Sequence, residues 1–226
     1  MSFVIIGGGP FACELLCYIK LLDQRGCNDY HIIAEDFNDI NFLNDYGINN
    51  LKIHNNIDDY IESINIGVDI AQQVYLGSGK PNVKIRMFNE IRKYFSKNLN
   101  IGQPLAMDNS TVLSKFVGLG SIIGPNAVIA PMAMIGHSVL INYGATIGHH
   151  TILEDFSCIG PNSSIGGKCL IKEGAYVGSG ACVREKITIG KNAIVGMGSV
   201  VTHDVPDNTT VIGIPARQVE IKGGWK

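Results

Sequence analysis

Aliphatic side chains in the second half of the chain recur at every sixth residue. From Val117 to Val201 each sixth position is Ile, Val or Leu, fifteen in succession. Four residues after each of them stands Ser, Ala, Thr, Cys or Val, with Ile187 as the one exception. An α-helix repeats at about 3.6 residues and a strand at about 2, so neither explains the spacing. A short strand followed by a corner explains the spacing. If three such faces make one coil, the fifteen hexapeptides form five coils of a solenoid.

Residues 1–100 follow another pattern, in which short apolar runs alternate with helical spacing. The run Phe3–Ile6 leads through a glycine-rich turn into a helical pattern that ends near Leu22. Two more apolar runs follow at 31–34 and 74–76, and a second helical pattern covers 85–95. Strands that alternate with helices predict a small parallel sheet.

Glycine and aromatic residues divide the chain at the same place. Residues 1–100 hold 12 of the 17 aromatic residues, whereas residues 101–226 hold 19 of the 27 glycines. A coil with one inward aliphatic side chain per face has an interior too narrow for aromatic rings, which explains the division. We therefore expect two domains, residues 1–100 and residues 101–226.

Charge and hydropathy exclude several classes of function. The net charge is −2, and no run of Lys and Arg is long enough to bind nucleic acid. No apolar stretch approaches the roughly 18 residues that span a membrane, and the first residues lack the basic start of a secretory signal. The six cysteines form no Cys-x-x-Cys pair, so we expect reduced thiols in a cytoplasmic protein.

A candidate phosphate-binding turn follows the first predicted strand. Gly7-x-Gly9-x-x-Ala12, with an acidic pair at the end of the second strand, matches the dinucleotide-binding fingerprint. A dinucleotide fold uses two such halves and about 100 residues supply only one, so we expect a mononucleotide or a nucleotide-sugar. The alternative is that the glycines only allow a tight turn with close packing of helix on strand.

The repeats and the end of the chain resemble the hexapeptide-repeat acyltransferases. Such enzymes close their repeats with a Gly-x-Pro-Ala-Arg/Lys turn, and here Val201-Thr-His-Asp-Val-Pro is followed by Gly213-Ile-Pro-Ala-Arg217. With the N-terminal pattern in front, the whole chain resembles the sialic acid O-acetyltransferase and bacillosamine-pathway N-acetyltransferase family. The resemblance implies a Rossmann-like α/β domain followed by a left-handed parallel β-helix, assembled as a homotrimer. It also implies acetyl-CoA as acyl donor and a nucleotide-linked amino sugar as acceptor, in the building of bacterial surface glycans such as the O-antigen of lipopolysaccharide.

A histidine pair at a predicted corner is the candidate catalytic centre. Acyl transfer needs a general base and donors for the developing oxyanion, and side chains at a corner project outward. The family motif Asn-x-x-Ala-x-x-x-His reads Asn142-Tyr-Gly-Ala-Thr-Ile-Gly-His149 here, so the resemblance implies that His149 is the base. His150 stands where the family has a carboxylate that orients the base. Gly167 lies one coil further on and is the candidate oxyanion donor.

Columns of equivalent residues, eighteen apart, indicate where coenzyme A lies. Gly160, Gly178 and Gly196 form one column, which leaves a bare backbone strip for the extended pantetheine arm. The alternative is that this corner position merely prefers glycine. The resemblance and the closing turn add further candidate coenzyme contacts: Cys158, Ser179, Met197, Pro215 and Arg217.

The nucleotide-sugar contacts come from the N-terminal loops. The family loop Gly-x-Gly-Gly-His reads Gly7-Gly-Gly-Pro-Phe11 here, so a phenylalanine replaces the family histidine. By this match the candidate substrate-binding residues are Gly8, Gly9, Pro10, Phe11, Glu35, Asp36 and Gly77.

Three other readings remain open. One is an O-acetyltransferase that acts on sialic acid or a related sugar. Another is a β-helix metalloenzyme of the γ-carbonic anhydrase type, although adjacent histidines are poorly spaced for one metal, and we expect none. The third is a nucleotide-sensing or scaffold protein without catalytic activity.

Overall fold

The computed structural model describes residues 2–7, 10–22, 29–34, 48, 51–63, 72–94 and 101–220. The chain divides into two compact units, one made of residues 1–79 and 83–103 and the other of residues 80–82 and 104–226.

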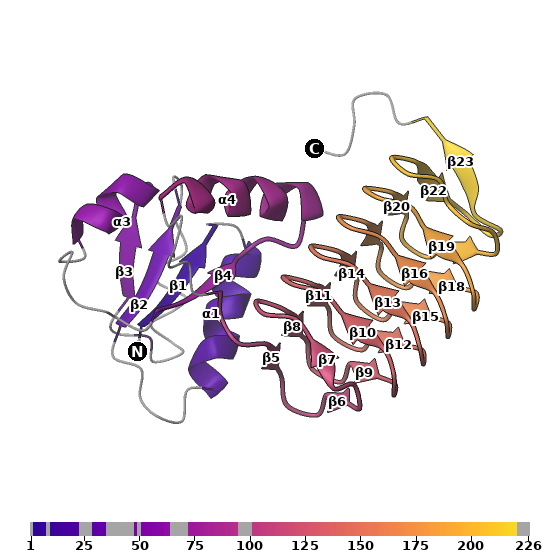
Figure 1. Ribbon diagram of the computed structural model, residues 1–226, viewed down its shortest axis with the longest axis horizontal. Helices are drawn as coiled ribbons and strands as arrows, with labels where there is room; N and C mark the ends of the chain where they lie inside the picture. Colours follow the sequence, from indigo (N-terminus) through magenta and orange to yellow (C-terminus); the bar gives the residue numbers. More distant parts are fainter. Residues whose placement is uncertain are drawn as a thin grey trace. The chain divides into compact units, whose positions relative to one another are not determined.

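The N-terminal unit is built on a four-stranded parallel sheet (Figure 1). Strands β1 (Ser2–Ile6), β2 (Asp29–Ile33), β3 (Leu51–His54) and β4 (Gln72–Leu76) lie in the order β3-β2-β1-β4. The helices are α1 (Pro10–Leu22), α3 (Ile57–Ser63) and α4 (Pro81–Tyr94). The predicted parallel sheet and the two predicted helices are confirmed. Strand β3 was not predicted, because it is a short edge strand with little hydrophobic pattern, and neither was α3.

A buried histidine pair lies inside this unit. His31 on β2 and His54 on β3 are only 5% and 7% exposed, and Nδ1 of His31 lies 3.0 Å from Nε2 of His54. Tyr60 of α3 meets both rings edge-on, and its buried hydroxyl has no hydrogen-bond partner in the described part of the chain. Burial, reinforced by the neighbouring His54, lowers the pKa of His31 from 6.5 to about 4, and burial also lowers the pKa of His54.

The C-terminal unit is a parallel β-helix with three sheets, which we name after their first strands. The β5 sheet contains β5 (Leu105–Ala106), β8 (Ile122–Ile123), β11 (Leu140–Ile141), β14 (Cys158–Ile159), β17 (Tyr176–Val177), β20 (Ile194–Val195), β22 (Thr210–Ile212) and the antiparallel β23 (Arg217–Val219). The β6 sheet contains β6 (Thr111–Val112), β9 (Val128–Ile129), β12 (Thr146–Ile147), β15 (Ser164–Ile165), β18 (Cys182–Val183) and β21 (Val200–Val201). The β7 sheet contains β7 (Phe116–Val117), β10 (Met134–Ile135), β13 (Ile152–Leu153), β16 (Leu170–Ile171) and β19 (Thr188–Ile189).

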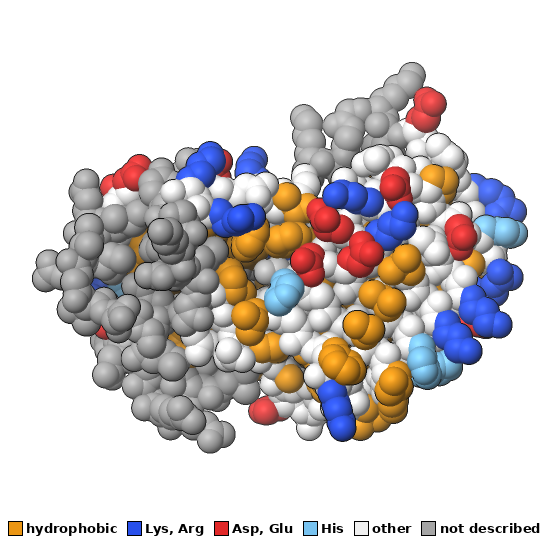
Figure 2. All heavy atoms as spheres, viewed as in Figure 1, with side chains coloured by type: hydrophobic (Ala, Val, Ile, Leu, Met, Phe, Trp, Pro, Cys, Tyr) orange, Lys and Arg blue, Asp and Glu red, His pale blue; other side chains and the backbone are white. Residues whose placement is uncertain are grey.

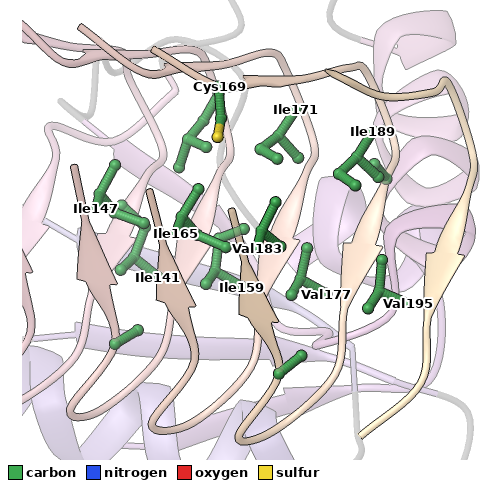
Figure 3. Packing of buried hydrophobic residues seen from close by; sticks show 14 of the residues in the cluster. Ile141, Ile147, Ile159, Ile165, Cys169, Ile171, Val177, Val183, Ile189 and Val195 are labelled. Atoms are coloured by element: carbon green, nitrogen blue, oxygen red, sulfur yellow. The ribbon is translucent and has the colours of Figure 1, made fainter. Parts of the chain in front are cut away.

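The interior of the β-helix follows the predicted pattern. Every position of the six-residue aliphatic series after Val117 is buried, and so is every small residue four positions later. Figure 3 shows Ile141, Ile147, Ile159 and their equivalents pointing into the narrow core. The buried hydroxyls are satisfied by backbone groups, as where Ser163 donates to the carbonyls of Gly160 and Gly178.

The β-helix is longer than the predicted five coils, because the β6 sheet alone has six strands. Strands β5 and β6 precede Val117, and β22 follows Val201. Their pairings span 17 or 16 residues, as in Leu105 with Ile122 and Ile194 with Thr210, whereas the regular coils span 18. A search of the sequence in steps of six residues therefore misses the strands of the coils that are one or two residues shorter.

Each corner has two positions with special requirements. From Gly120 to Gly198 every sixth residue has φ between 52° and 71°, the left-handed region, and nine of these fourteen residues are not glycine. The residue two positions earlier is glycine more often, for a steric reason. A Cβ on Gly148, for example, would lie 2.5 Å from the nitrogen of Gly167 in the next coil. This close approach explains why glycine is frequent at these positions of the β-helix.

The buried histidine pair generates a prediction about acid stability. In the unfolded chain His31 takes up a proton near pH 6.5, whereas in the folded protein it stays neutral down to about pH 4. The unfolded state therefore binds more protons in this range, and the free energy of unfolding falls as the pH is lowered through it. Urea unfolding, read out by hydrogen exchange of the β2 amides, measures this fall. The His31→Leu variant should lose less stability on acidification, and the exposed His203→Gln variant should behave as the wild type does. An unchanged slope in His31→Leu would contradict the assignment.

Candidate functional site

His149 lies at the corner between the β6 and β7 sheets, which we call the His149 corner. It is exposed and stands two residues after the inward Ile147 that ends β12. The strand register places His149, Gly167, Glu185 and His203 in one column along the β-helix. The backbone here is fixed by stacking, since Lys168 N–H donates to the His149 carbonyl over 2.8 Å and Lys186 N–H to that of Gly167 over 3.0 Å.

The imidazole of His149 lies directly against Gly167. A Cβ built on Gly167 would be 2.7 Å from Nε2 of His149 and 3.0 Å from two ring carbons. The N–H of Gly167 donates no hydrogen bond within the described part of the chain. The structure thus brings a basic ring nitrogen and an open backbone donor to one exposed corner.

His150 contacts His149 directly. Nδ1 of one ring lies 3.0 Å from Nδ1 of the other, and the ring planes are nearly perpendicular at 88°. His150 occupies the left-handed position of the corner, with φ of 60°.

Asn142 lies at a different corner from His149. It follows β11 at the corner between the β5 and β6 sheets, and its Oδ1 accepts a hydrogen bond from Tyr143 N–H over 2.8 Å. The register instead places Asn142 in the column of Gly160, Gly178 and Gly196. One chain therefore does not bring Asn142 and His149 together.

The glycine column has a steric cause of its own. A Cβ on Gly160 would lie 2.7 Å from the nitrogen of Ser179, and one on Gly178 would lie 2.6 Å from that of Met197. Glycines at the other two corners meet the next coil equally closely, as at Gly118 and Gly166. Close stacking therefore explains the column without a ligand, and its role in holding coenzyme A stays a prediction.

The remaining candidate coenzyme contacts differ in accessibility. Ser179, Pro215 and Arg217 are exposed, and Met197 is 72% exposed. Cys158 is only 1% exposed, and its thiol is directed to the Phe156 carbonyl at 3.8 Å. Its side chain is therefore not presented at the surface.

The described N-terminal candidates gather at the carboxyl edge of the parallel sheet. Gly7 N–H donates to Ile33 O over 3.0 Å, and Gly77 N–H donates to Ile6 O over 2.8 Å. Gly7 has φ of +125°, and a Cβ there would lie 2.8 Å from the Gly77 carbonyl oxygen. Pro10 and Phe11 begin α1 at the same edge. Four further candidates lie outside the described residues: Gly8, Gly9, Glu35 and Asp36.

The third corner lies between the β7 sheet and the next β5 strand and holds none of the candidate site residues named above. Side chains there cap backbone N–H groups along the stack. His137 Nδ1 accepts from Leu119 N–H over 3.0 Å, and Asp155 accepts from His137 N–H over 2.7 Å. Further along, Lys191 N–H and the Lys172 ammonium donate to Asp207 and lower the pKa of that carboxyl. We call this the Glu154 corner.

A groove of about 370 Å³ runs beside the Glu154 corner. The outward side chains of Phe116, Met134 and Ile152 form its apolar part, and all three are at least 40% exposed. Its acidic lining comes from Glu154, Asp155 and Glu173. Figure 2 shows an apolar band on the β-helix, with a mixture of acidic and basic side chains on one side of it and mostly basic and histidine side chains along the opposite rim. None of the sequence-predicted site residues lines this groove, although Phe116, Met134 and Ile152 lie eighteen residues apart in one outward column.

Two features are absent from the described residues. The described part of the chain holds no group of three or more His, Cys, Asp or Glu side chains arranged to bind a metal ion. No helix in the described ranges is long and apolar enough to cross a membrane.

Known proteins are similar to this chain in fold. Residues 168–203 match the family model described as bacterial transferase hexapeptide (six repeats). A search of curated proteins gives no match.

Solved structures match over nearly the full length. A mutant perosamine N-acetyltransferase from Caulobacter crescentus, in complex with CoA and GDP-perosamine, is 21% identical over 98% of both chains with a TM-score of 0.78. WeeI from Acinetobacter baumannii is 21% identical over 97% of this chain and 100% of its own, with a TM-score of 0.80. The acetyltransferase domain of PglB from Neisseria gonorrhoeae, in complex with acetyl coenzyme A, is 20% identical over 96% and 98%, with a TM-score of 0.77. At such identity the likeness shows the fold, and the C-terminal unit is a left-handed parallel β-helix.

Two adjacent glycines at the His149 corner should differ in what an added methyl group does. In Gly167→Ala the new Cβ meets the flexible His149 ring, so the ring moves and stability changes little. In Gly166→Ala it meets backbone, 2.5 Å from the nitrogen of Glu185, so we expect a loss of about 1–3 kcal/mol. Thermal unfolding and the NMR signals of the His149 ring measure the two effects. Equal destabilisation by both variants would contradict this prediction.

Proposed function

We propose that this protein is an N-acetyltransferase that transfers the acetyl group of acetyl-CoA to the amine of a nucleotide-linked amino sugar. The observation that carries the proposal is the juxtaposition of the exposed His149 ring with the open N–H of Gly167. Structurally similar proteins bind CoA with GDP-perosamine, or acetyl coenzyme A, and this supports the choice of donor and acceptor.

The chemistry assigns one step to each group. Acetyl-CoA supplies a thioester carbonyl that an amine can attack. His149 accepts the proton that the sugar nitrogen loses as the carbon–nitrogen bond forms. The carbon–sulfur bond then breaks, and the His149 imidazolium returns this proton to the departing sulfur, so that CoA leaves as the thiol and His149 is neutral again. Gly167 N–H donates to the oxyanion that develops on the carbonyl oxygen, where such a donor is worth several kcal/mol.

The N-terminal unit is proposed to hold the nucleotide. Its strand order β3-β2-β1-β4 is that of a Rossmann-like half, and ligands of open parallel sheets bind at the carboxyl ends of the strands. Gly7, Gly77 and the start of α1 all lie at that edge. Phe11 at this edge offers a ring for stacking but no donor for phosphate. The proposed setting is cytoplasmic synthesis of bacterial surface glycans such as the O-antigen.

We also propose a homotrimer, because the candidate residues are spread over two corners of one coil. A rotational contact can bring the corner of Asn142 and Gly160 in one subunit to the His149 corner of the next. The β7 sheet offers the surface for it. Its apolar band lies between the acidic residues of the Glu154 corner and the His149 corner, which carries Lys168, Arg184 and Lys186.

A thiol-release assay tests the reaction. Acetyl-CoA is incubated with UDP-, dTDP- and GDP-linked 3- and 4-amino sugars, with sialic acid as a hydroxyl acceptor, and free CoA thiol is measured. We expect release with an amino sugar, and a loss of about 10²–10⁴-fold in kcat for His149→Ala. His137→Ala serves as control, since His137 is engaged in capping Leu119 at another corner. A His149→Ala variant as active as the wild type would rule out His149 as the base.

Light scattering tests the assembly. A homotrimer has a mass of about 73 kDa, three times 24.4 kDa. The Met134→Lys variant places a charge in the apolar band and should shift the mass toward that of the single chain. A monomeric wild-type protein would refute the proposed assembly.

A further inference from the structure

Two consecutive histidine side chains meet at the His149 corner, which regular backbone does not allow. Neighbouring side chains of a strand point to opposite faces. Here the left-handed conformation of His150, with φ of 60°, accompanies a contact in which the two Nδ1 atoms are 3.0 Å apart. The distance is that of a hydrogen bond, so one ring donates and the other accepts.

The direction of this hydrogen bond decides whether His149 can act as a base. If Nδ1 of neutral His149 holds the proton, its Nε2 has a free lone pair beside Gly167. If His150 donates instead, the proton of neutral His149 sits on Nε2, and that nitrogen cannot accept another. Two rings that are both protonated at Nδ1 would face each other with two hydrogens across 3.0 Å.

We propose that His150 is the positioning residue of the site, accepting a hydrogen bond at its Nδ1 from Nδ1–H of His149. This rests on the proposed function, in which His149 accepts a proton at Nε2. The arrangement serves both stages of the reaction, because the His149 imidazolium still donates from Nδ1 to a neutral His150. His150 thereby orients the base without adding a negative charge, which distinguishes it from the carboxylate of the family that the sequence resembles.

The other two corners supply matched variants. The left-handed position that His150 occupies is held at the corner between the β5 and β6 sheets by Asn126 and Asn162, with φ of 58° and 54°, and by Gly144 and Gly180, with φ of 65° and 67°. At the Glu154 corner Asn192 holds it, with φ of 53°. Both residue types therefore suit this backbone. An Asn at position 150 keeps an acceptor, Oδ1, two bonds from Cβ as Nδ1 is, whereas a Gly removes it. Comparing the two separates the hydrogen bond from the shape of the corner.

Kinetics gives the first test. We expect His150→Asn to keep kcat within about threefold of the wild type, and His150→Gly to lose at least about tenfold in kcat with little change in KM for acetyl-CoA. Asn192→Gly, the same kind of change at the Glu154 corner more than two coils further on, is the control for backbone effects. A His150→Gly variant with wild-type kcat would overturn the proposal.

Nitrogen NMR of histidine-labelled protein gives a second test that needs no turnover. In the wild type, Nδ1 of His149 should carry the proton and Nε2 should not, with the reverse in His150; His149→Asn and His150→Asn assign the signals. A proton on Nε2 of neutral His149 would overturn the proposal even if the enzyme is active. If no amino sugar supports thiol release, the proposed function fails, and the NMR result still decides the direction of the hydrogen bond.

Discussion

Coils of the β-helix stack at the spacing of neighbouring strands, about 4.8 Å, and this spacing decides which residue each position accepts. Inside, it leaves room for one aliphatic and one small side chain per hexapeptide. At the first residue of a corner it brings the next coil so close that a Cβ at Gly148 or Gly166 would meet backbone at 2.5 Å. The same spacing lays the His149 ring against Gly167. The site is therefore a consequence of stacking, and its geometry depends on the fixed register between neighbouring coils.

The sequence predicted the regular part of this architecture because the constraint repeats. The aliphatic series and the small residues four positions later are buried as expected, and the predicted helices appear as α1 and α4. The six-residue period did not predict strands β5, β6 and β22, because their coils are one or two residues shorter than eighteen. The groove at Phe116, Met134 and Ile152 was not predicted either, because the six-residue count follows only the inward side chains, although these three outward residues repeat every eighteen residues.

The candidate site could be predicted only where the spacing of residues along the sequence determines their positions in the structure. His149 and Gly167 are eighteen residues apart and fall in one column, so the repeat alone brings them together. Asn142 is seven residues from His149 and yet lies at another corner. The contact between the two imidazoles could not be read from the sequence, because it depends on a left-handed backbone conformation that nine non-glycine residues, of six types, adopt at the corners.

A structure of the protein with bound coenzyme A tests the central claim most directly. We expect the thiol of the coenzyme to lie beside Nε2 of His149, within the roughly 2.6–3.2 Å reach of a general base or one water molecule further. We expect the pantetheine arm to follow the column of Gly160, Gly178 and Gly196, contributed by a neighbouring subunit. A coenzyme seated in the groove at Phe116 and Met134, with His149 facing only solvent, would contradict the assignment of the His149 corner as the site of acyl transfer.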